Sequence, residues 1–183
     1  MPKMKEKTLF DLVAEATQKE NVPSLLIGGF AVNYHGIMRQ TQDVDFLMME
    51  KDYDKIRPFL EKSGCHEVVR NNLFARLENR ETLPSELDIM FVVQETLKGM
   101  LDEAEITEIK GKKFKVASLD HLLALKLHAM KQNIRRRGFR DLTDVLDLAE
   151  RNQIDTKSKK FEDLCLKYGG EEIYRMIKEL LKK

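Results

Sequence analysis

Two aspartates separated by one residue are the most chemically informative feature of the sequence. Asp43 and Asp45 lie in the run DVDFLM, whose apolar residues predict a strand. Side chains two residues apart on a strand point to the same face, so the two carboxylates would lie side by side while Val44 and Phe46 face the other way. Neighbouring like charges destabilise a fold unless a cation compensates them. The pair therefore predicts a divalent-cation site.

A third carboxylate extends this prediction. Mg²⁺ prefers a few carboxylate oxygens together with substrate phosphates, and two such ions about 3.5–4 Å apart can hold the attacking and leaving oxygens of an in-line displacement. Asp88 lies in the run ELDIMFV, which predicts a neighbouring strand. We expect Asp88 to be the third ligand, beside the ion that activates the attacking hydroxyl.

The residues before the aspartates are of types that bind phosphate oxygens. Gly28 and Gly29 follow a predicted strand and precede a short helix, so the backbone would pass close to a triphosphate and offer N–H donors. Arg39 and Thr41 would add charge-assisted and hydroxyl contacts to the same oxygens. Alone, a Gly-Gly pair is usually a turn and an Asp-x-Asp pair is often a solvated face. Their order along the chain favours phosphate chemistry.

The elements that must position these residues form an α/β first half and a helical second half. Short apolar runs predict strands of one mixed sheet at 24–27, 44–48, 67–69, 73–77 and 87–93, with a hairpin at 106–116. Helical periodicity and caps predict helices from Leu9 (capped by Thr8), at 30–35, 52–62, 94–104 and 119–130, from about 140, and at 161–168 and 171–181. We expect an α/β (α+β) core at 1–117 and a helical region at 118–183 packed on it.

Length and composition place the chain among folded proteins of one well-buried domain, or of one domain with a small helical appendage. It has 183 residues, 42% hydrophobic and 34% charged, and its net charge of +1 creates no global field that requires a nucleic-acid partner. The longest apolar stretch, 25–32, is far below the ~20 residues needed to span a bilayer, which predicts a cytoplasmic protein without membrane contact. Cys65 and Cys165 match no metal or redox spacing and are expected to be buried, reduced thiols.

These motifs resemble the polymerase-beta-like nucleotidyltransferase superfamily, whose signature is Gly-Gly or Gly-Ser, a short gap and then Asp-x-Asp. The resemblance implies Gly28 and Gly29 as nucleotide-binding residues, Asp43 and Asp45 as metal ligands, and Asp88 as the third carboxylate. It also implies a reaction, in which a nucleoside monophosphate passes from an NTP to a hydroxyl and pyrophosphate is released.

Within that superfamily the sequence is most similar to the bacterial toxin and abortive-infection type. There, Gly-Gly-x-Ala and Arg-x-Thr-x-Asp-x-Asp precede a helical half with a lysine helix, which LLALKLHA at 122–129 and RDLTD at 140–144 resemble. The likeness spans about 25–148. It implies that Lys126 and Asp144 belong to the nucleotide-binding set and that a cognate antitoxin is a possible partner. Small antibiotic adenylyltransferases share the first motif but tend to have a longer spacer before the aspartates.

The residues of the helical half leave alternatives open. Lys126 is the one formally charged residue within 121–130 if both histidines are neutral, so its ammonium must reach water or meet an anion. Asp141, Asp144 and Asp147 recur along one side of the next helix and would hold Lys126 or a bound target, although Asp147 fits a solvated face equally well.

The acceptor is left open by the sequence. Arg135, Arg136 and Arg137 would either guide a polyanionic acceptor such as tRNA or form a solvated loop, so the acceptor is RNA, a protein or a small molecule. The alternative function is a catalytically inactive nucleotidyltransferase fold that binds or regulates a partner. Intact Asp43, Asp45 and Asp88 favour the enzyme.

Overall fold

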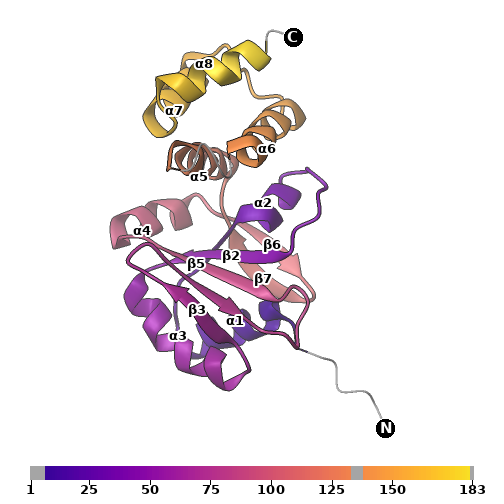
Figure 1. Cartoon of the computed structure of the whole chain (residues 1–183), viewed down its shortest axis with the longest axis vertical. Coiled ribbons are helices and arrows are strands. Elements are labelled where there is room, and N and C mark those ends of the chain that lie inside the picture. Colours follow the sequence, from indigo (N-terminus) through magenta and orange to yellow (C-terminus); the bar gives the residue numbers. More distant parts are fainter. Residues whose placement is uncertain (1–6, 133–137, 182–183) are drawn as a thin grey trace. The chain divides into compact units, whose positions relative to one another are not determined.

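The computed structural model describes residues 7–132 and 138–181, which form one mixed sheet and eight helices (Figure 1). The strands are β1 (Leu25–Ile27), β2 (Asp43–Met48), β3 (His66–Arg70), β4 (Phe74–Glu78), β5 (Glu86–Phe91), β6 (Glu105–Ile109) and β7 (Lys112–Val116). The helices are α1 (Leu9–Lys19), α2 (Gly28–Tyr34), α3 (Glu50–Lys62), α4 (Gln94–Asp102), α5 (Leu119–Gln132), α6 (Gly138–Arg151), α7 (Lys159–Tyr168) and α8 (Glu171–Leu180). The expected α/β fold with a mixed sheet and C-terminal helices is confirmed.

The sheet has seven strands in the order β3-β4-β5-β2-β1-β7-β6. β2 pairs with β5 in parallel and with β1 in antiparallel orientation, and β1 pairs with β7 in parallel. The expected hairpin is β6–β7, and its two turn residues Lys110 and Gly111 both have positive φ, at 51° and 83°. Such a turn matches the twist of the flanking strands. β2 therefore lies in the interior of the sheet, with a partner on each side.

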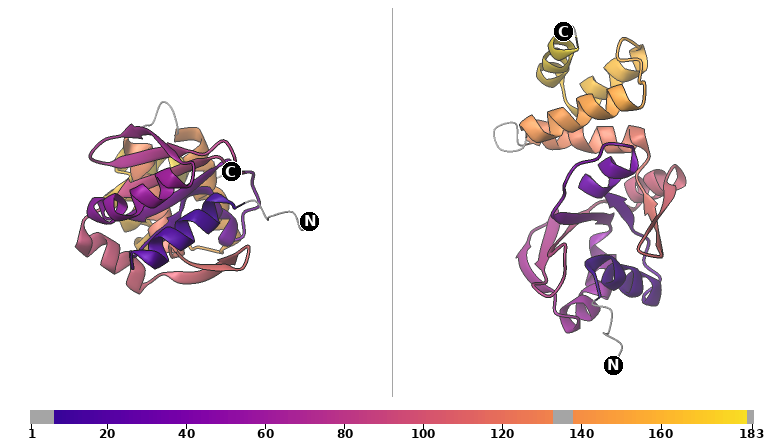
Figure 2. Two further views of the ribbon diagram at one scale, coloured as in Figure 1. Left: turned by 90° about the horizontal axis from the view of Figure 1, so that it is seen from below. Right: turned by 90° about the vertical axis from the view of Figure 1, so that its right-hand side faces the viewer.

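One face of the sheet is covered by α1 and α3, which lie beside each other (Figure 1 and Figure 2). The Phe10 ring on α1 packs against Phe46 on β2 and Phe114 on β7, with centroids 6.5 Å and 5.6 Å apart. Val44 and Phe46 are fully buried, whereas Asp43 and Asp45 are half-buried. The strand alternation expected from the sequence is therefore present, with the apolar residues toward the helices and the carboxylates on the other face.

Several helix starts differ slightly from the expectation. α1 begins after Thr8 as predicted, with a capping box in which the Thr8 backbone N–H donates to the Asp11 carboxylate. That hydrogen bond lowers the pKa of Asp11. α2 begins at Gly28, α3 at Glu50 and α7 at Lys159, each two residues earlier than expected, because helix ends are defined only to within one or two residues.

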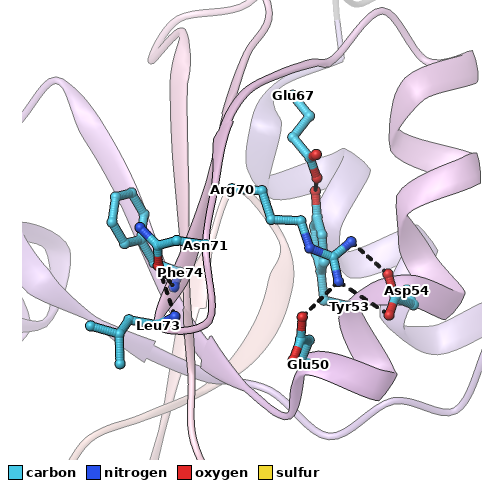
Figure 3. Close-up of polar contacts among 8 residues, drawn as sticks. All are labelled: Glu50, Tyr53, Asp54, Glu67, Arg70, Asn71, Leu73 and Phe74. Atoms are coloured by element: carbon cyan, nitrogen blue, oxygen red, sulfur yellow. Dashed lines mark hydrogen bonds and ion pairs between the residues drawn. The ribbon is translucent and has the colours of Figure 1, made fainter.

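An ion-pair cluster attaches the edge strand β3 to α3 (Figure 3). Arg70 donates to the Asp54 Oδ1 at 2.7 Å and to the Glu50 Oε1 at 2.8 Å, and its guanidinium lies 5.3 Å from the centroid of the Tyr53 ring. The hydrogen bond from Arg70 lowers the pKa of the Asp54 carboxyl. Tyr53 in turn donates to the Glu67 carboxylate on β3. The cluster lies on the helix-covered face of the sheet.

The described residues divide into two compact units. The sheet unit contains those up to Ala31 and Arg39–Ser118, and the helical unit contains Val32–Met38 and those from Leu119 onward. In the helical unit α5 contacts α6, α7 and α8. The Asn152 amide donates to the His35 carbonyl at 3.1 Å and so links the segment Val32–Met38 to α6 and the residues that follow it. The expected division into a core at 1–117 and a helical region at 118–183 packed on it stays a prediction.

Two further expectations concern the whole chain. Cys65 and Cys165 are buried free thiols, as expected, and burial raises the pKa of Cys165 to about 12. Within residues 7–132 and 138–181, the helices are each too short or too polar to traverse a lipid bilayer.

Replacing Phe46 by Ala is expected to lower the free energy of unfolding of the sheet unit by ~3–5 kcal/mol, because it leaves a cavity under β2. Urea denaturation followed by far-UV circular dichroism would measure it. The matched control is Leu73→Ala, whose side chain is 65% exposed and whose loss should change stability by at most about 0.5 kcal/mol. Equal effects of the two substitutions would contradict the assignment of Phe46 to the core.

Candidate active site

Three carboxylates converge on the face of the sheet opposite α1 and α3. Asp43 and Asp45 project from β2 and Asp88 from β5, and one oxygen of each lies within 4.8 Å of the others. Asp88 is buried and the other two are half-buried. Among the described residues this is the only group of three or more acidic, cysteine or histidine side chains with that geometry. The structure thus brings the three predicted ligands together.

Strand register explains why the three carboxylates meet. β2 and β5 run parallel, and Asp45 lies directly opposite Asp88 while Asp43 lies opposite Glu86. Directly opposed residues on neighbouring strands have their side chains on the same face and close together. The sequence predicted that the strands were neighbours, and the register completes the site.

The donor set fits a hard divalent cation. It consists of carboxylate oxygens alone, which suit Mg²⁺ or Mn²⁺ better than the softer metals that prefer thiolate or imidazole ligands. Three carboxylates so close together repel one another, and a bound cation removes that repulsion. Asp43, Asp45 and Asp88 can therefore hold such an ion.

Arg76 is a residue of this site that the sequence analysis missed. It lies on β4 directly opposite Asp88, and its guanidinium donates from Nε to Oδ1 at 2.7 Å and from Nη2 to Oδ2 at 2.6 Å. Its Nη1 also lies 3.6 Å from Glu86 Oε2. Hydrogen bonds to Asp88 raise the pKa of Arg76 further above its ordinary value. The alternation in FARLE predicted a strand, but only the register places Arg76 against Asp88.

The two glycines lie against the aspartate strand. A β-carbon at Gly28 would overlap the Asp45 carboxylate. Gly28 also has a φ of +64°, which residues other than glycine rarely adopt. A β-carbon at Gly29 would overlap the Thr41 hydroxyl and lie 3.3 Å from Arg39 Nη2. Both positions therefore require glycine for close approach of the backbone to the site.

The predicted phosphate contacts Arg39 and Thr41 adjoin the same place. The Thr41 hydroxyl donates to Asp43 Oδ1 at 2.9 Å, so it orients one of the predicted metal ligands. Arg39 is half-buried beside Gly29. Gly28, Gly29, Arg39 and Thr41 thus form one continuous surface with the aspartates, and their contacts with a nucleotide stay predictions.

Lys126 lies in a buried ion-pair cluster of the helical unit. Its ammonium is 2.8 Å from Asp141 Oδ1 and 2.7 Å from Asp144 Oδ2, and the three side chains are 11%, 9% and 3% exposed. The Lys126 ammonium therefore contacts anions of its own chain, which was one of the expected alternatives. Asp147, on the same helix as Asp141 and Asp144, is half-buried. Lys126 belongs to the helical unit, whereas the predicted metal ligands Asp43, Asp45 and Asp88 belong to the sheet unit. The contact of Lys126 with phosphates therefore stays a prediction.

The arginines predicted to guide an acceptor, at positions 135, 136 and 137, lie outside the residues that the structure describes. Their role in binding RNA therefore stays a prediction.

Solved nucleotidyltransferase structures share this fold. ANT(2″)-Ia in complex with adenylyl-2″-tobramycin has 14% identity and a TM-score of 0.63, covering 87% of this chain and 94% of that one. The lincomycin-bound lincosamide adenylyltransferase LnuA has 18% identity and a TM-score of 0.53 over 79% and 96%. The Megavirus polyadenylate synthase has 16% identity and a TM-score of 0.53 over 83% of this chain and 34% of that one. At these identities the likeness shows the fold.

Comparison of the sequence alone gives a more specific result. No curated protein matches the chain. A family described as uncharacterised nucleotidyltransferases matches residues 8–183, which include the glycine pair, all three aspartates and the helical half. The chain therefore belongs to this nucleotidyltransferase family, which confirms the resemblance drawn from the Gly-Gly and Asp-x-Asp motifs.

Proposed function

We propose that the protein transfers a nucleoside monophosphate from a Mg²⁺-bound NTP to a hydroxyl of an acceptor and releases pyrophosphate. The observation that carries this proposal is the convergence of Asp43, Asp45 and Asp88 next to the backbone of Gly28 and Gly29. Carboxylates repel a triphosphate unless metal ions lie between them, and the glycine pair lets the backbone approach the phosphates closely. The arrangement therefore suits a metal-bound triphosphate.

The three aspartates are the proposed ligands of two Mg²⁺ ions. When bound, Mg²⁺ would neutralise charge on the transferring phosphoryl group and favour deprotonation of the attacking hydroxyl. Thr41 holds Asp43 in position through its hydroxyl. Gly28 and Gly29 let the backbone approach the triphosphate, and Arg39 would contact its oxygens through charge-assisted hydrogen bonds.

In the proposed reaction the acceptor oxygen forms a bond to the α-phosphorus of the NTP, and the bond from that phosphorus to the β-phosphate oxygen breaks. The hydroxyl proton must pass to a base. Asp88 is the candidate, because each oxygen of an ionised carboxylate can accept more than the one hydrogen bond that Arg76 donates to it.

The acceptor can be found with labelled nucleotides. Purified protein is incubated with each labelled NTP, Mg²⁺ and a total cell extract, and the label is followed into RNA, protein and small molecules. We expect one NTP to label one of these classes. If the folded protein transferred label from none of the NTPs but still bound one, the alternative of a catalytically inactive regulatory protein would replace this proposal.

The acceptor classes follow from the proteins that share the fold. A solved relative contains adenylyl-2″-tobramycin, another contains lincomycin, and a third is a polyadenylate synthase, so both small molecules and RNA are to be tested. A toxin–antitoxin role and a cytoplasmic location stay predictions from the sequence. Labelling of protein or tRNA in the extract would support the toxin role.

Replacing Asp45 by Asn is expected to abolish transfer while leaving the fold intact. The substitution removes a metal ligand, and it also relieves repulsion among the carboxylates, so the melting temperature without metal should hold or rise. Transfer at saturating Mg²⁺ and thermal melting would be measured on the same sample. Near-wild-type transfer by this variant would refute the metal-binding role of Asp45.

Replacing Gly28 by Ala is expected to lower transfer by about 10²-fold or more, because the new methyl group must displace the Asp45 carboxylate and misplacement of a catalytic group by about 1 Å can have such an effect. The matched control is Gly99→Ala in α4, where a β-carbon meets nothing within 4 Å. That control should transfer normally and be slightly more stable, as is usual for alanine in a helix. Equal activity of the two variants would contradict the close approach of Gly28 to the site.

Replacing Lys126 by Ala is expected to affect both stability and turnover. It removes the ammonium that contacts both Asp141 and Asp144, and the removal of one partner of a buried ion pair typically destabilises by ~3–5 kcal/mol. If Lys126 also contacts phosphates, turnover per folded molecule should fall by ~10²-fold or more. Melting temperature and turnover per folded molecule would be measured together.

The control for this experiment restores the charge balance. Lys126→Ala combined with Asp141→Asn and Asp144→Asn removes the ammonium together with both carboxylates that it contacts. Turnover that returned to the wild-type level in the triple variant would show that Lys126 acts only on stability.

A further inference from the structure

Arg76 lies in strand register with two of the three candidate metal ligands. Strand pairing aligns it with Asp88 on β5, and Asp88 with Asp45 on β2, so that Arg76, Asp88 and Asp45 form one row across the sheet. All three project from the face that carries the carboxylates, since directly opposed residues share a face. In this row the guanidinium of Arg76 lies next to the carboxylate of Asp88, and Asp45 follows on the far side of Asp88.

The contacts of Arg76 engage both oxygens of Asp88. The Nε and Nη2 atoms donate to separate oxygens at 2.7 Å and 2.6 Å, a bidentate arrangement that fixes the plane of the carboxylate. The Asp88 side chain is 9% exposed and that of Arg76 is 28% exposed. Glu86 approaches the third nitrogen of the same guanidinium at 3.6 Å. Asp88 is therefore held in one orientation by a partner on the neighbouring strand.

The other two carboxylates of the site lie close to this ion pair. Arg76 donates to both oxygens of Asp88, and one Asp88 oxygen lies within 4.8 Å of an oxygen of Asp43 and of Asp45. The guanidinium thus lies in the combined field of the acidic cluster. It offsets part of the repulsion that three neighbouring carboxylates create when no metal ion is bound.

We infer that Arg76 is a positioning residue for Asp88 and the built-in counter-charge of the acidic cluster. Its planar fork orients the carboxylate toward Asp45, and its positive charge keeps the cluster together before Mg²⁺ binds while weakening the hold of the cluster on Mg²⁺ alone. This inference rests on the proposed function, because it concerns the same metal-binding carboxylates.

A purely structural role predicts different behaviour. An arginine that only joins neighbouring elements would contribute to stability without any link to Mg²⁺. Arg70 provides that comparison, because it also makes a bidentate ion pair, is 25% exposed, and lies on the opposite, helix-covered face of the sheet (Figure 3). Its partners Asp54 and Glu50 are not among the three clustered aspartates.

The first measurement is the affinity for Mg²⁺ alone. Mg²⁺ is titrated into nucleotide-free protein and followed by the rise in melting temperature, since a ligand that binds the folded state raises it according to its affinity. Arg76→Gln should melt earlier than wild type without Mg²⁺ and bind Mg²⁺ about tenfold more tightly, because a positive charge near the ion has been removed. Arg76→Lys keeps the charge and should bind Mg²⁺ as wild type does. Arg70→Gln should alter the melting temperature without altering Mg²⁺ affinity.

The second measurement is transfer of the nucleoside monophosphate, with the acceptor found by the labelling experiment. Lysine cannot reproduce the planar fork, so Arg76→Lys and Arg76→Gln should both lose about tenfold or more in kcat, with the KM for NTP changed by less than about twofold. Arg70→Gln should keep the wild-type kcat. Because Arg76→Lys preserves the charge, it tests the orientation of Asp88 even if Arg76→Gln fails to fold.

Two outcomes overturn this inference, and they are distinguishable from failure of the proposed function. An unchanged Mg²⁺ affinity in folded Arg76→Gln would refute the counter-charge, and a wild-type kcat in Arg76→Lys would refute the positioning role. In both cases the wild type would still bind Mg²⁺ and transfer label. A wild type that neither responds to Mg²⁺ nor transfers label would instead refute the proposed function, and this inference with it.

Discussion

Repulsion among three carboxylates is the constraint on which the rest of the sheet unit depends. Asp43, Asp45 and Asp88 have oxygens within 4.8 Å of one another because β2 and β5 pair in one fixed register. Such proximity opposes folding unless other groups offset it. Arg76 offsets it through charge, and Thr41 stabilises Asp43 through a hydrogen bond. The site is thus held together by contacts that each act on a different carboxylate.

The opposite face of the sheet supplies the free energy that keeps this arrangement rigid. Phe46 is buried directly behind the aspartate pair and packs with Phe10 and Phe114 under α1. Burial of an aromatic side chain contributes several kcal/mol, which exceeds the typical effect of one partly exposed ion pair. A strand whose sides alternate between this core and the carboxylates cannot shift its register by one residue without exposing the core. Hydrophobic burial therefore fixes the positions of the charges.

Features with a local signal could be predicted from the sequence. The alternation around Val44 and Phe46 placed the two aspartates on one face, and Thr8 marked the start of the first helix. The hairpin followed from Lys110-Gly111 between alternating residues. Each of these depends on residues that are neighbours in the chain, where backbone geometry alone determines the outcome.

Features that depend on register between distant segments could not be predicted. Arg76 is opposite Asp88 only because β4 and β5 pair without an offset, and one residue of slippage would place it on the other face. The segment Val32–Met38 groups with the helical unit, in which the His35 carbonyl accepts a hydrogen bond from Asn152, more than a hundred residues away. Lys126 was expected either to reach water or to meet an anion, and the relative placement of α5 and α6 brings its ammonium to Asp141 and Asp144.

The acidity of the site also has a consequence for the order in which its ligands bind. Carboxylates and a triphosphate carry charge of the same sign, so under the proposed function the NTP and its metal ions must each increase the affinity of the site for the other. Arg76 acts on the two ligands in opposite directions, because a cation beside Asp88 weakens the binding of metal alone but favours the anionic nucleotide. Under the proposed function the site therefore binds the metal more tightly once the nucleotide is present, and until then Asp88 stays paired with Arg76.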